Sequence, residues 1–291
     1  MTNTFHTALF ICAILISKTY CNQMPKPETI TSAANPLVKD VRRAIARGGL
    51  TEQGWCVAES FHLLEEALRS DCAVRMVLAG ESVRSAAEAH VRRLNGVKIV
   101  ILPDALMQSV SGTENSQGIM ALVQPPEWKL EQLFRGCALV VVLDGLQDPG
   151  NAGAILRAAE AFGATGALFL KGTVSPFNSK TLRASAGSLF RVPFLFGMDA
   201  ALAKAALQQN KITLYAAVPA GSNQTAHTLT RTDLTVSAGL IIGNEARGVS
   251  SALRNAALDL SIPTLGVESL NAAVAAGIIL YEARRQRSLP G

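Results

Sequence analysis

The stretch LDGLQDPGNAGAILRAAEAFGATG, residues 143–166, contains the strand-to-helix transition on which the predicted fold depends. An apolar run at residues 137–143 leads into it and predicts a buried strand. Asp-Gly and Asp-Pro-Gly-Asn steps then predict a loop, with Asn151 placed to cap the next helix. Apolar residues at helical spacing predict that helix from Ala152 onward, and Gly163 is expected to end it.

One cation, Arg157, lies between one and two turns into this predicted helix. Gly150 and Gly153 have no side chains, so we expect the neighbouring backbone to be uncovered. Two interpretations are open. Either this is a plain strand–loop–helix unit with a solvated arginine, or the open turn and the arginine form part of a site.

Length and composition restrict the class of protein. The 291 residues suffice for two domains with their own cores, and 49% hydrophobic against 17% charged residues predicts a globular chain. A net charge of +5 suits an anionic partner such as RNA, although it also serves plain solubility. The five cysteines are scattered, without Cys-x-x-Cys or a nearby histidine. We therefore predict a reducing, cytoplasmic location and no metal site.

Residues 1–23 differ from the rest of the chain. The apolar run at residues 8–16 has signal-peptide length and is too short to span a membrane. No Lys or Arg precedes it and no clear small-x-small cleavage site follows, whereas Met24 opens an ordinary cytosolic beginning. We interpret residues 1–23 as a mis-assigned or disordered extension rather than a secretion signal.

Residues 24–124 predict a small α/β domain, because short apolar runs alternate with helical patterns. Its first helix would present Lys39, Arg42, Arg43 and Arg47 on one side, as a solvated face or as a grip on RNA phosphates. Paired prolines within residues 124–127 then predict a linker at residues 125–137.

Residues 138–291 predict a second α/β domain. About six apolar runs alternate with helical patterns, which indicates a parallel sheet covered by helices on both faces. Three glycine-rich loops, at residues 144–151, 243–248 and 263–269, follow predicted strands. Ligands bind beyond the carboxyl ends of parallel strands, so we expect these loops to line one pocket.

These loops and the helices after them supply five candidate site residues: Asn151, Arg157, Glu245, Ser269 and Asn271. Taken singly, each has a structural interpretation, such as helix capping or an ion pair between Glu245 and Arg247. Their convergence favours a site. Dinucleotide and P-loop glycine motifs are absent, and no histidine lies near the loops in sequence.

The three loops resemble, in order and spacing, the motifs of the SpoU/TrmH family of RNA ribose 2′-O-methyltransferases, which belong to the SPOUT class. The matching segments are DPGNAG…R at residues 148–157, IGNEARG at 242–248, and IP…SLNAAVAA at 262–276. NPLVK at residues 35–39 and E…LLEEAL at 59–68 resemble the family's L30e-like substrate-binding domain. Glu59-Ser60 stands where that domain usually has Glu-Gly.

The resemblance implies a deep trefoil knot in residues 138–291, which general topology rules would not suggest. The knot would bind S-adenosylmethionine, with Gly243, Ile262 and Leu270 at the cofactor. The resemblance further implies an RNA partner and a homodimer with its sites near the subunit boundary. It implies neither a membrane nor a metal.

The implied reaction is attack of a ribose 2′-hydroxyl on the sulfonium methyl group. Arg157 matches the family's catalytic arginine. An arginine stays protonated, so we interpret it as an electrostatic activator of the hydroxyl, with an RNA phosphate or another local acceptor taking the proton. Glu245 and Ser269 would position Arg157 or the ribose, while Asn151 and Asn271 would hold the loops and the substrate.

RNA phosphates would contact residues of both domains, and the candidates are Lys180, Arg183, Arg191, Arg42 and Arg43. We predict 23S rRNA as the target. The alternatives are a tRNA 2′-O-methyltransferase, or a non-catalytic RNA-binding or ribosome-assembly factor on the same fold. Retention of all five site residues disfavours the non-catalytic alternative. A secreted hydrolase is disfavoured because G-x-S-x-G is absent.

Overall fold

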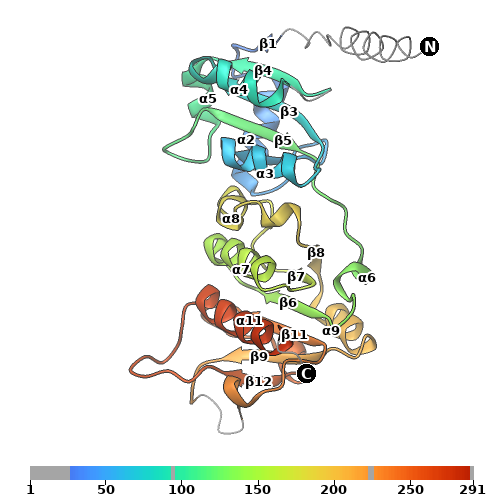
Figure 1. The fold of residues 1–291 in the computed structure, drawn as a ribbon. Coiled ribbons are helices and arrows are strands. Elements are labelled where there is room, and N and C mark those ends of the chain that lie inside the picture. Colours follow the sequence, from blue (N-terminus) through green and yellow to red (C-terminus); the bar gives the residue numbers. More distant parts are fainter. Residues whose placement is uncertain (1–26, 93–95, 222–225, 289–291) are drawn as a thin grey trace, which may run out of the picture.

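The computed structural model describes residues 27–92, 96–221 and 226–288, so the predicted extension at residues 1–23 lies outside the described residues. Two units follow one another along the long axis of the molecule, each built on its own sheet (Figure 1). A single extended connection with one short helix, α6 (Leu130–Leu133), joins them. Within the described residues, no helix is long and apolar enough to cross a membrane.

The first unit contains a mixed five-stranded sheet in the order β1-β4-β3-β5-β2, with β5 antiparallel to both of its neighbours. Its strands are β1 (Glu28–Thr29), β2 (Cys56–Glu59), β3 (Val74–Gly80), β4 (Lys98–Leu102) and β5 (Ile119–Val123). Its α-helices are α2 (Pro36–Arg47), α3 (Phe61–Arg69), α4 (Arg84–Val91) and α5 (Asp104–Val110).

Helix α2 follows the local rules closely. The Asn35 side chain accepts a hydrogen bond from the Leu37 amide at 2.9 Å, and Pro36 occupies the first helical position. Gly48 ends the helix in the left-handed conformation, with φ of 60°. The helix buries its apolar side and leaves Arg43 and Arg47 exposed. The predicted basic face is therefore confirmed as a surface, and its RNA contact stays a prediction.

The second unit contains a seven-stranded sheet in the order β10-β12-β9-β11-β6-β7-β8, with every strand pair parallel. Its strands are β6 (Leu139–Asp144), β7 (Gly166–Leu170), β8 (Phe194–Met198), β9 (Thr213–Val218), β10 (His227–Thr228), β11 (Ala238–Gly243) and β12 (Leu258–Ser261). Its α-helices are α7 (Pro149–Ala161), α8 (Ser179–Ser185), α9 (Ala200–Gln209), α10 (Ser251–Arg254) and α11 (Ala272–Ser288).

Helices cover both faces of this sheet, as predicted. Val141 and Leu143 of β6 share one apolar core with residues of α7 and α11. Val140 and Val142 of the same strand belong to another core, with residues of α9. Because successive side chains of a strand point to opposite faces, α7 and α11 lie on one face and α9 on the other (Figure 1). The knot implied by the family resemblance stays a prediction.

The cap of α7 differs from the prediction. Asp148, not Asn151, caps this helix, because Pro149 already occupies its first position and the Asp148 side chain accepts the Asn151 amide at 2.6 Å. The other end is as predicted. Gly163 follows the last turn with φ of 74° and donates its amide to the Glu160 carbonyl at 3.2 Å.

Gly153 is also placed differently from the expectation of uncovered backbone. It is buried under α8, and a β-carbon at this position would lie 2.4 Å from the Thr181 carbonyl oxygen and 2.6 Å from the Ala184 β-carbon. The glycine therefore permits close packing of α7 against α8. The small and hydroxyl residues of the α8 segment gave no helical pattern, so this helix was not predicted.

Arg287 fastens the end of α11 to the sheet. Its guanidinium donates to the carbonyls of Leu234 at 2.8 Å, Cys137 at 2.9 Å and Val236 at 2.6 Å, at the entries to β6 and β11. We expect Arg287→Lys to lower the free energy of unfolding by about 2 kcal/mol, because one ammonium group cannot replace a guanidinium fork. Urea denaturation measures this, and Arg284→Lys on the same helix should stay near wild type.

Candidate active site

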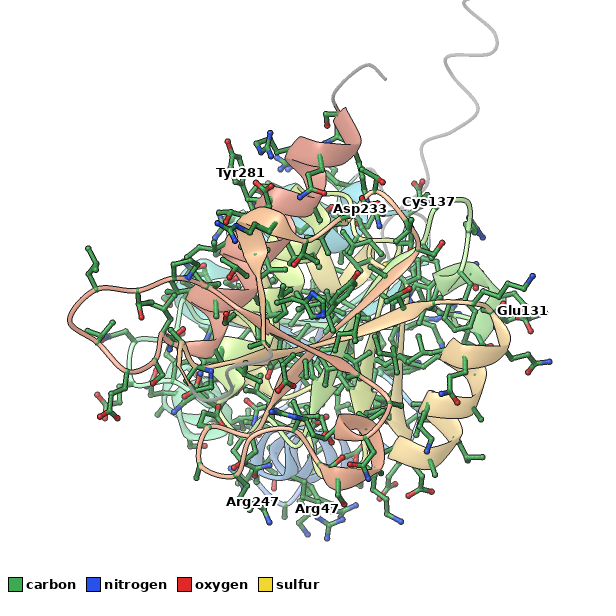
Figure 2. The ribbon with its side chains drawn as sticks, turned by 90° about the horizontal axis from the view of Figure 1, so that it is seen from below. Arg47, Glu131, Cys137, Asp233, Arg247 and Tyr281 are labelled. Atoms are coloured by element: carbon green, nitrogen blue, oxygen red, sulfur yellow. The ribbon has the colours of Figure 1, made fainter. Side chains whose placement is uncertain are left out.

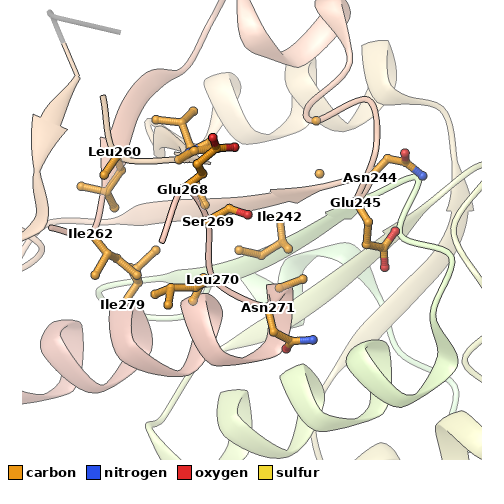
Figure 3. Close-up of a pocket in the computed structure, with 18 of the residues that line it drawn as sticks. Ile242, Asn244, Glu245, Leu260, Ile262, Glu268, Ser269, Leu270, Asn271 and Ile279 are labelled. Atoms are coloured by element: carbon orange, nitrogen blue, oxygen red, sulfur yellow. The ribbon is translucent and has the colours of Figure 1, made fainter. Parts of the chain in front are cut away.

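An open cavity of about 610 Å³ lies at the carboxyl ends of β9, β11 and β12 (Figure 3). The loop after β11, the segment between β12 and α11, and the first turns of α11 form its walls. It brings together seven of the predicted catalytic and cofactor residues: Asn151, Gly243, Glu245, Ile262, Ser269, Leu270 and Asn271. The predicted convergence of the three loops is therefore observed.

Glu245 connects the second loop to the first. Its carboxylate accepts the backbone amides of Gln147 and Asp148, both at 3.3 Å, and the side-chain amide of Asn151 at 3.4 Å. Burial raises the pKa of Glu245, but hydrogen bonds from its own backbone amide and from these donors outweigh it and hold the pKa below its ordinary value. Glu245 thus stays ionised at neutral pH and holds the start of α7.

Asn151 and Asn271 extend this connection to the third loop. The Asn271 side-chain amide donates to the Asn151 side-chain oxygen at 3.0 Å. The Asn271 oxygen accepts the amides of Ala273 at 2.9 Å and Val274 at 3.3 Å, so this residue also caps α11. We call Glu245, Asn151 and Asn271 the loop triad. Its hydrogen bonds link all three predicted loops.

Asn244, which was not among the candidates, stabilises the second loop. Its backbone exchanges hydrogen bonds with Gly248, at 3.0 and 2.8 Å, and its side-chain oxygen accepts the amides of Ala246 and Arg247, both at 3.0 Å. Its side-chain amide donates to the Gly145 carbonyl at 2.8 Å in the first loop. The Gly-Asn step was the available signal, because asparagine often bonds backbone two residues onward.

Gly243 lies at the start of this loop and is tightly packed against backbone atoms. A β-carbon here would lie 2.4 Å from both the Gly248 carbonyl carbon and the Val249 nitrogen. Backbone atoms cannot move aside as a flexible side chain can. Residue 243 must therefore be glycine for the loop to close in this form, and the closed loop leaves backbone groups at the cavity wall.

The residues around the cavity fit S-adenosylmethionine. Four apolar side chains, Leu260, Ile262, Leu270 and Ile279, line one part and suit an adenine ring. Glu245 and Glu268 add carboxylates, which suit a cationic ligand. The volume lies within the range of about 300–1,000 Å³ that is usual for small-molecule sites. Within the described residues, no group of His, Cys, Asp or Glu is placed to hold a metal ion.

Arg157 lies outside the cavity wall. It is exposed on α7 and makes no hydrogen bond or ion pair within the described part of the chain. The structure thus assembles Asn151, Glu245, Ser269 and Asn271 and leaves the guanidinium of Arg157 free at the surface. Its catalytic role stays a prediction.

The candidate RNA contacts lie in different environments. Lys180 is exposed, Arg43 pairs with Glu52 at 2.5 Å, and Arg42 donates to Ser109 at 3.2 Å. Arg183 and Arg191 lie where the two units meet, and Arg191 bonds to Glu66 and Glu160. These bonds give Arg191 a structural role. For all five residues, contact with phosphate stays a prediction.

Comparison with known proteins gives one consistent result. Residues 138–281 match the SpoU rRNA Methylase family, and residues 35–121 match the MRM3-like substrate binding domain. The 23S rRNA (guanosine(2553)-2′-O)-methyltransferase RlmP of Bacillus subtilis is 32% identical over 257 residues, covering 88% of this chain and 98% of the relative. RlmB of Xanthomonas axonopodis, a 23S rRNA (guanosine-2′-O-)-methyltransferase, is 34% identical over 69% of this chain and 82% of its own.

Solved structures agree with these relatives. The SpoU methyltransferase AviRb from Streptomyces viridochromogenes, in complex with the cofactor AdoMet, has a TM-score of 0.74 and 27% identity over 87% of this chain and 99% of its own. An AdoMet-bound rRNA methyltransferase from Sinorhizobium meliloti has a TM-score of 0.72 and 25% identity, covering 90% of this chain and 98% of its own. The chain belongs to the SpoU rRNA methylase family.

Proposed function

We propose that this protein transfers the methyl group of S-adenosylmethionine to a ribose 2′-hydroxyl of 23S rRNA, in the cytoplasm, where ribosomes are assembled. The principal supporting observation is the loop triad at the edge of a cavity that fits the cofactor. Two relatives named as 23S rRNA 2′-O-methyltransferases, one matching 88% and the other 69% of this chain, support the same substrate.

The residues of this chain have separate roles in the reaction. Bound S-adenosylmethionine would supply an electrophilic methyl group and leave as the demethylated thioether. The proton of the ribose hydroxyl would pass to an RNA phosphate or another local acceptor. Arg157 stabilises the negative charge that develops on the ribose oxygen. The development of this charge is the largest barrier to the reaction, because a hydroxyl is a weak nucleophile. The loop triad fixes the first turn of α7 and with it the direction in which this helix presents Arg157. Ser269, at the cavity wall, positions the ribose.

The proposal is tested by offering the pure protein labelled S-adenosylmethionine with 23S rRNA, 16S rRNA or total tRNA. We expect label in 23S rRNA alone. Label in tRNA alone would support the tRNA alternative, and no label in any RNA would support a non-catalytic RNA-binding factor. Mapping ribose methylation in the labelled 23S rRNA then identifies the nucleotide.

Glu245 provides a graded test of the loop triad. Glu245→Ala removes the acceptor of three donors, so we expect about tenfold slower methyl transfer or more. Glu245→Gln keeps one acceptor oxygen and should fall between Ala and wild type. Initial rates at saturating RNA measure this, with circular dichroism to check folding. Equal rates for wild type, Glu245→Gln and Glu245→Ala would show that the loop triad does not contribute to methyl transfer.

We also propose that the protein is a homodimer formed through α7 and α11. Val274, Ile278 and Tyr281 recur on one side of α11 and are 51%, 38% and 56% exposed. Tyr281 projects outward in Figure 2, on the side opposite to Arg47 and Arg247. Such a stripe of apolar side chains is typical of an interface. A second copy covering it would place the exposed Arg157 near the subunit boundary.

Light scattering tests this interface. Ile278→Glu places a charge in the proposed contact and should convert a dimer into a monomer. Leu202→Glu is the matched control, because Leu202 is 63% exposed on α9 at the opposite face of the sheet. A monomeric wild-type protein at micromolar concentration would contradict the proposed dimer, as would an Ile278→Glu variant that stays dimeric.

A further inference from the structure

The two units meet through one segment of the second unit, residues 178–191. It contains α8 and the 3₁₀ turn η2 (Ser188–Phe190), and it faces β2 and α3 of the first unit. In Figure 1, α8 lies between α7 and the first unit. We call this region the domain contact. In the two ion pairs that cross it, the arginine belongs to the second unit and the carboxylate to the first.

Arg191 donates four hydrogen bonds in the domain contact. Its Nη1 donates to Glu66 Oε2 at 2.7 Å and to Ser70 Oγ at 3.1 Å, both on the first unit. Its Nε and Nη2 donate to the two carboxylate oxygens of Glu160 on the last turn of α7, the second of them at 3.0 Å. One guanidinium therefore joins α3 of the first unit to α7 of the second.

The backbone around Arg191 fits the first unit closely. Gly187 has φ of 89°, and a β-carbon there would lie 2.5 Å from the β-carbon of Glu66. At the other end, Arg183 Nη1 lies 3.8 Å from Glu59 Oε1. Glu59 is buried and also accepts the Ser111 hydroxyl at 2.9 Å. The contact thus has charged pairs at two points with tight packing at Gly187.

Glu66 and Glu160 are the two carboxylates that bond to Arg191, and their pKa values agree with a preformed contact. Burial raises the pKa of Glu66, but hydrogen bonds from Arg191 and Arg69 outweigh it and hold the pKa below its ordinary value. The hydrogen bond from Arg191 lowers the pKa of Glu160. Both carboxylates therefore stay ionised at neutral pH, when the arginine is also charged.

We propose that Arg191 is a positioning residue that fixes the substrate-binding unit relative to the active-site cavity. The proposal rests on the proposed function, because the RNA held by the first unit is the substrate. Glu160 and Asn151 lie at opposite ends of α7, so Arg191 connects α3 directly to the helix that begins at the cavity. RNA bound to the first unit then meets the cavity at one distance and in one orientation.

A fixed orientation saves the entropy that two loosely joined units would lose when both engage one RNA. Removing Arg191 should therefore weaken productive RNA capture more than it slows the chemical step. The kinetic effect of the substitution therefore distinguishes a positioning residue from a catalytic residue. A catalytic arginine would lower kcat, whereas a positioning arginine raises the RNA concentration that gives half the maximal rate.

The first experiment measures methyl transfer by Arg191→Gln in the full chain. We expect the half-saturating RNA concentration to rise about tenfold, with the affinity for S-adenosylmethionine unchanged and kcat at saturating RNA within about twofold of wild type. Arg191→Lys should recover only part of the loss, because one ammonium cannot span both carboxylates. Arg84→Gln is the matched control, because Arg84 pairs with Glu88 inside α4 and touches neither carboxylate that bonds to Arg191.

The second experiment needs no RNA and no cofactor. Small-angle X-ray scattering of Arg191→Gln and of Glu66→Gln should give a broader distance distribution than wild type, and Arg84→Gln should match wild type. Glu66→Gln removes the negative charge that faces Arg191 on the first unit and keeps the Arg191–Glu160 pair, so it tests the contact even when Arg191→Gln folds poorly. Wild-type scattering and wild-type RNA half-saturation in both variants would overturn the proposal. If scattering broadens in the variants while the wild-type protein methylates no RNA, the role of Arg191 in the domain contact would stand and the proposed function would be contradicted instead.

Discussion

Arg157→Ala is expected to lower the rate constant of methyl transfer by about 10²- to 10³-fold, which is the usual effect of removing one donor that stabilises a developing oxyanion. The affinity for S-adenosylmethionine should not change, because Arg157 does not line the cavity. Single-turnover rates at saturating RNA measure the first quantity and calorimetric titration the second. The fold should stay intact, because Arg157 is exposed and bonds to no other described residue.

Two further variants make this result specific. Arg157→Lys keeps the charge but loses the guanidinium fork, so it should recover only part of the rate. Arg135→Ala removes an exposed arginine before β6, at the end of the sheet away from the cavity, and should react like wild type. Rapid turnover by Arg157→Ala would exclude the arginine from the chemical step.

Gly243→Ala is expected to abolish binding of S-adenosylmethionine, with an affinity loss beyond about 100-fold. The added methyl group would overlap the backbone of Gly248 and Val249, at 2.4 Å from each. Relief requires opening the bridge between Asn244 and Gly248 that closes the loop, and this moves the backbone out of the cavity wall. Overpacking alone usually costs about 1–3 kcal/mol, which is a factor of 5 to more than 100.

The control is Gly49→Ala, where the added methyl group would meet nothing within 4 Å. It should bind the cofactor like wild type. Calorimetric titration of both variants measures the difference, and thermal unfolding checks that each is folded. A Gly243→Ala variant that is folded and binds the cofactor normally would show that the loop can close in another way, and the account of this cavity wall would be wrong.

The sequence predicted most of the central sheet because β6, β7, β9 and β11 are nearly continuous apolar runs, as buried parallel strands must be. It did not predict β10, whose two residues are His227 and Thr228. It predicted the end of α7 at Gly163 for an equally local reason, since glycine tolerates the left-handed conformation there. It placed the cap of α7 three residues too late, at Asn151 rather than Asp148. Both are good capping residues, and the proline between them was the deciding feature.

The sequence predicted which loops form the site, but not which side chains within those loops contact one another. The carboxyl ends of parallel strands share one edge of a sheet, so three loops after such strands were expected to meet. The pairing of Asn271 with Asn151, and of Asn151 with Glu245, depends on side-chain directions that no spacing encodes. Arg191 illustrates the same limit, because the sequence does not say which surfaces of two domains face each other.

The position of the transferred methyl group shows whether this protein methylates a ribose 2′-hydroxyl. The pure protein is incubated with 23S rRNA and S-adenosylmethionine labelled in the methyl group, and the RNA is then hydrolysed with alkali. Alkaline cleavage needs a free 2′-hydroxyl, so ribose methylation leaves the label in an uncleaved dinucleotide. We predict that all incorporated label appears there and that Arg157→Ala incorporates it about 10²- to 10³-fold more slowly. Label in mononucleotides would show methylation of a base and contradict the account.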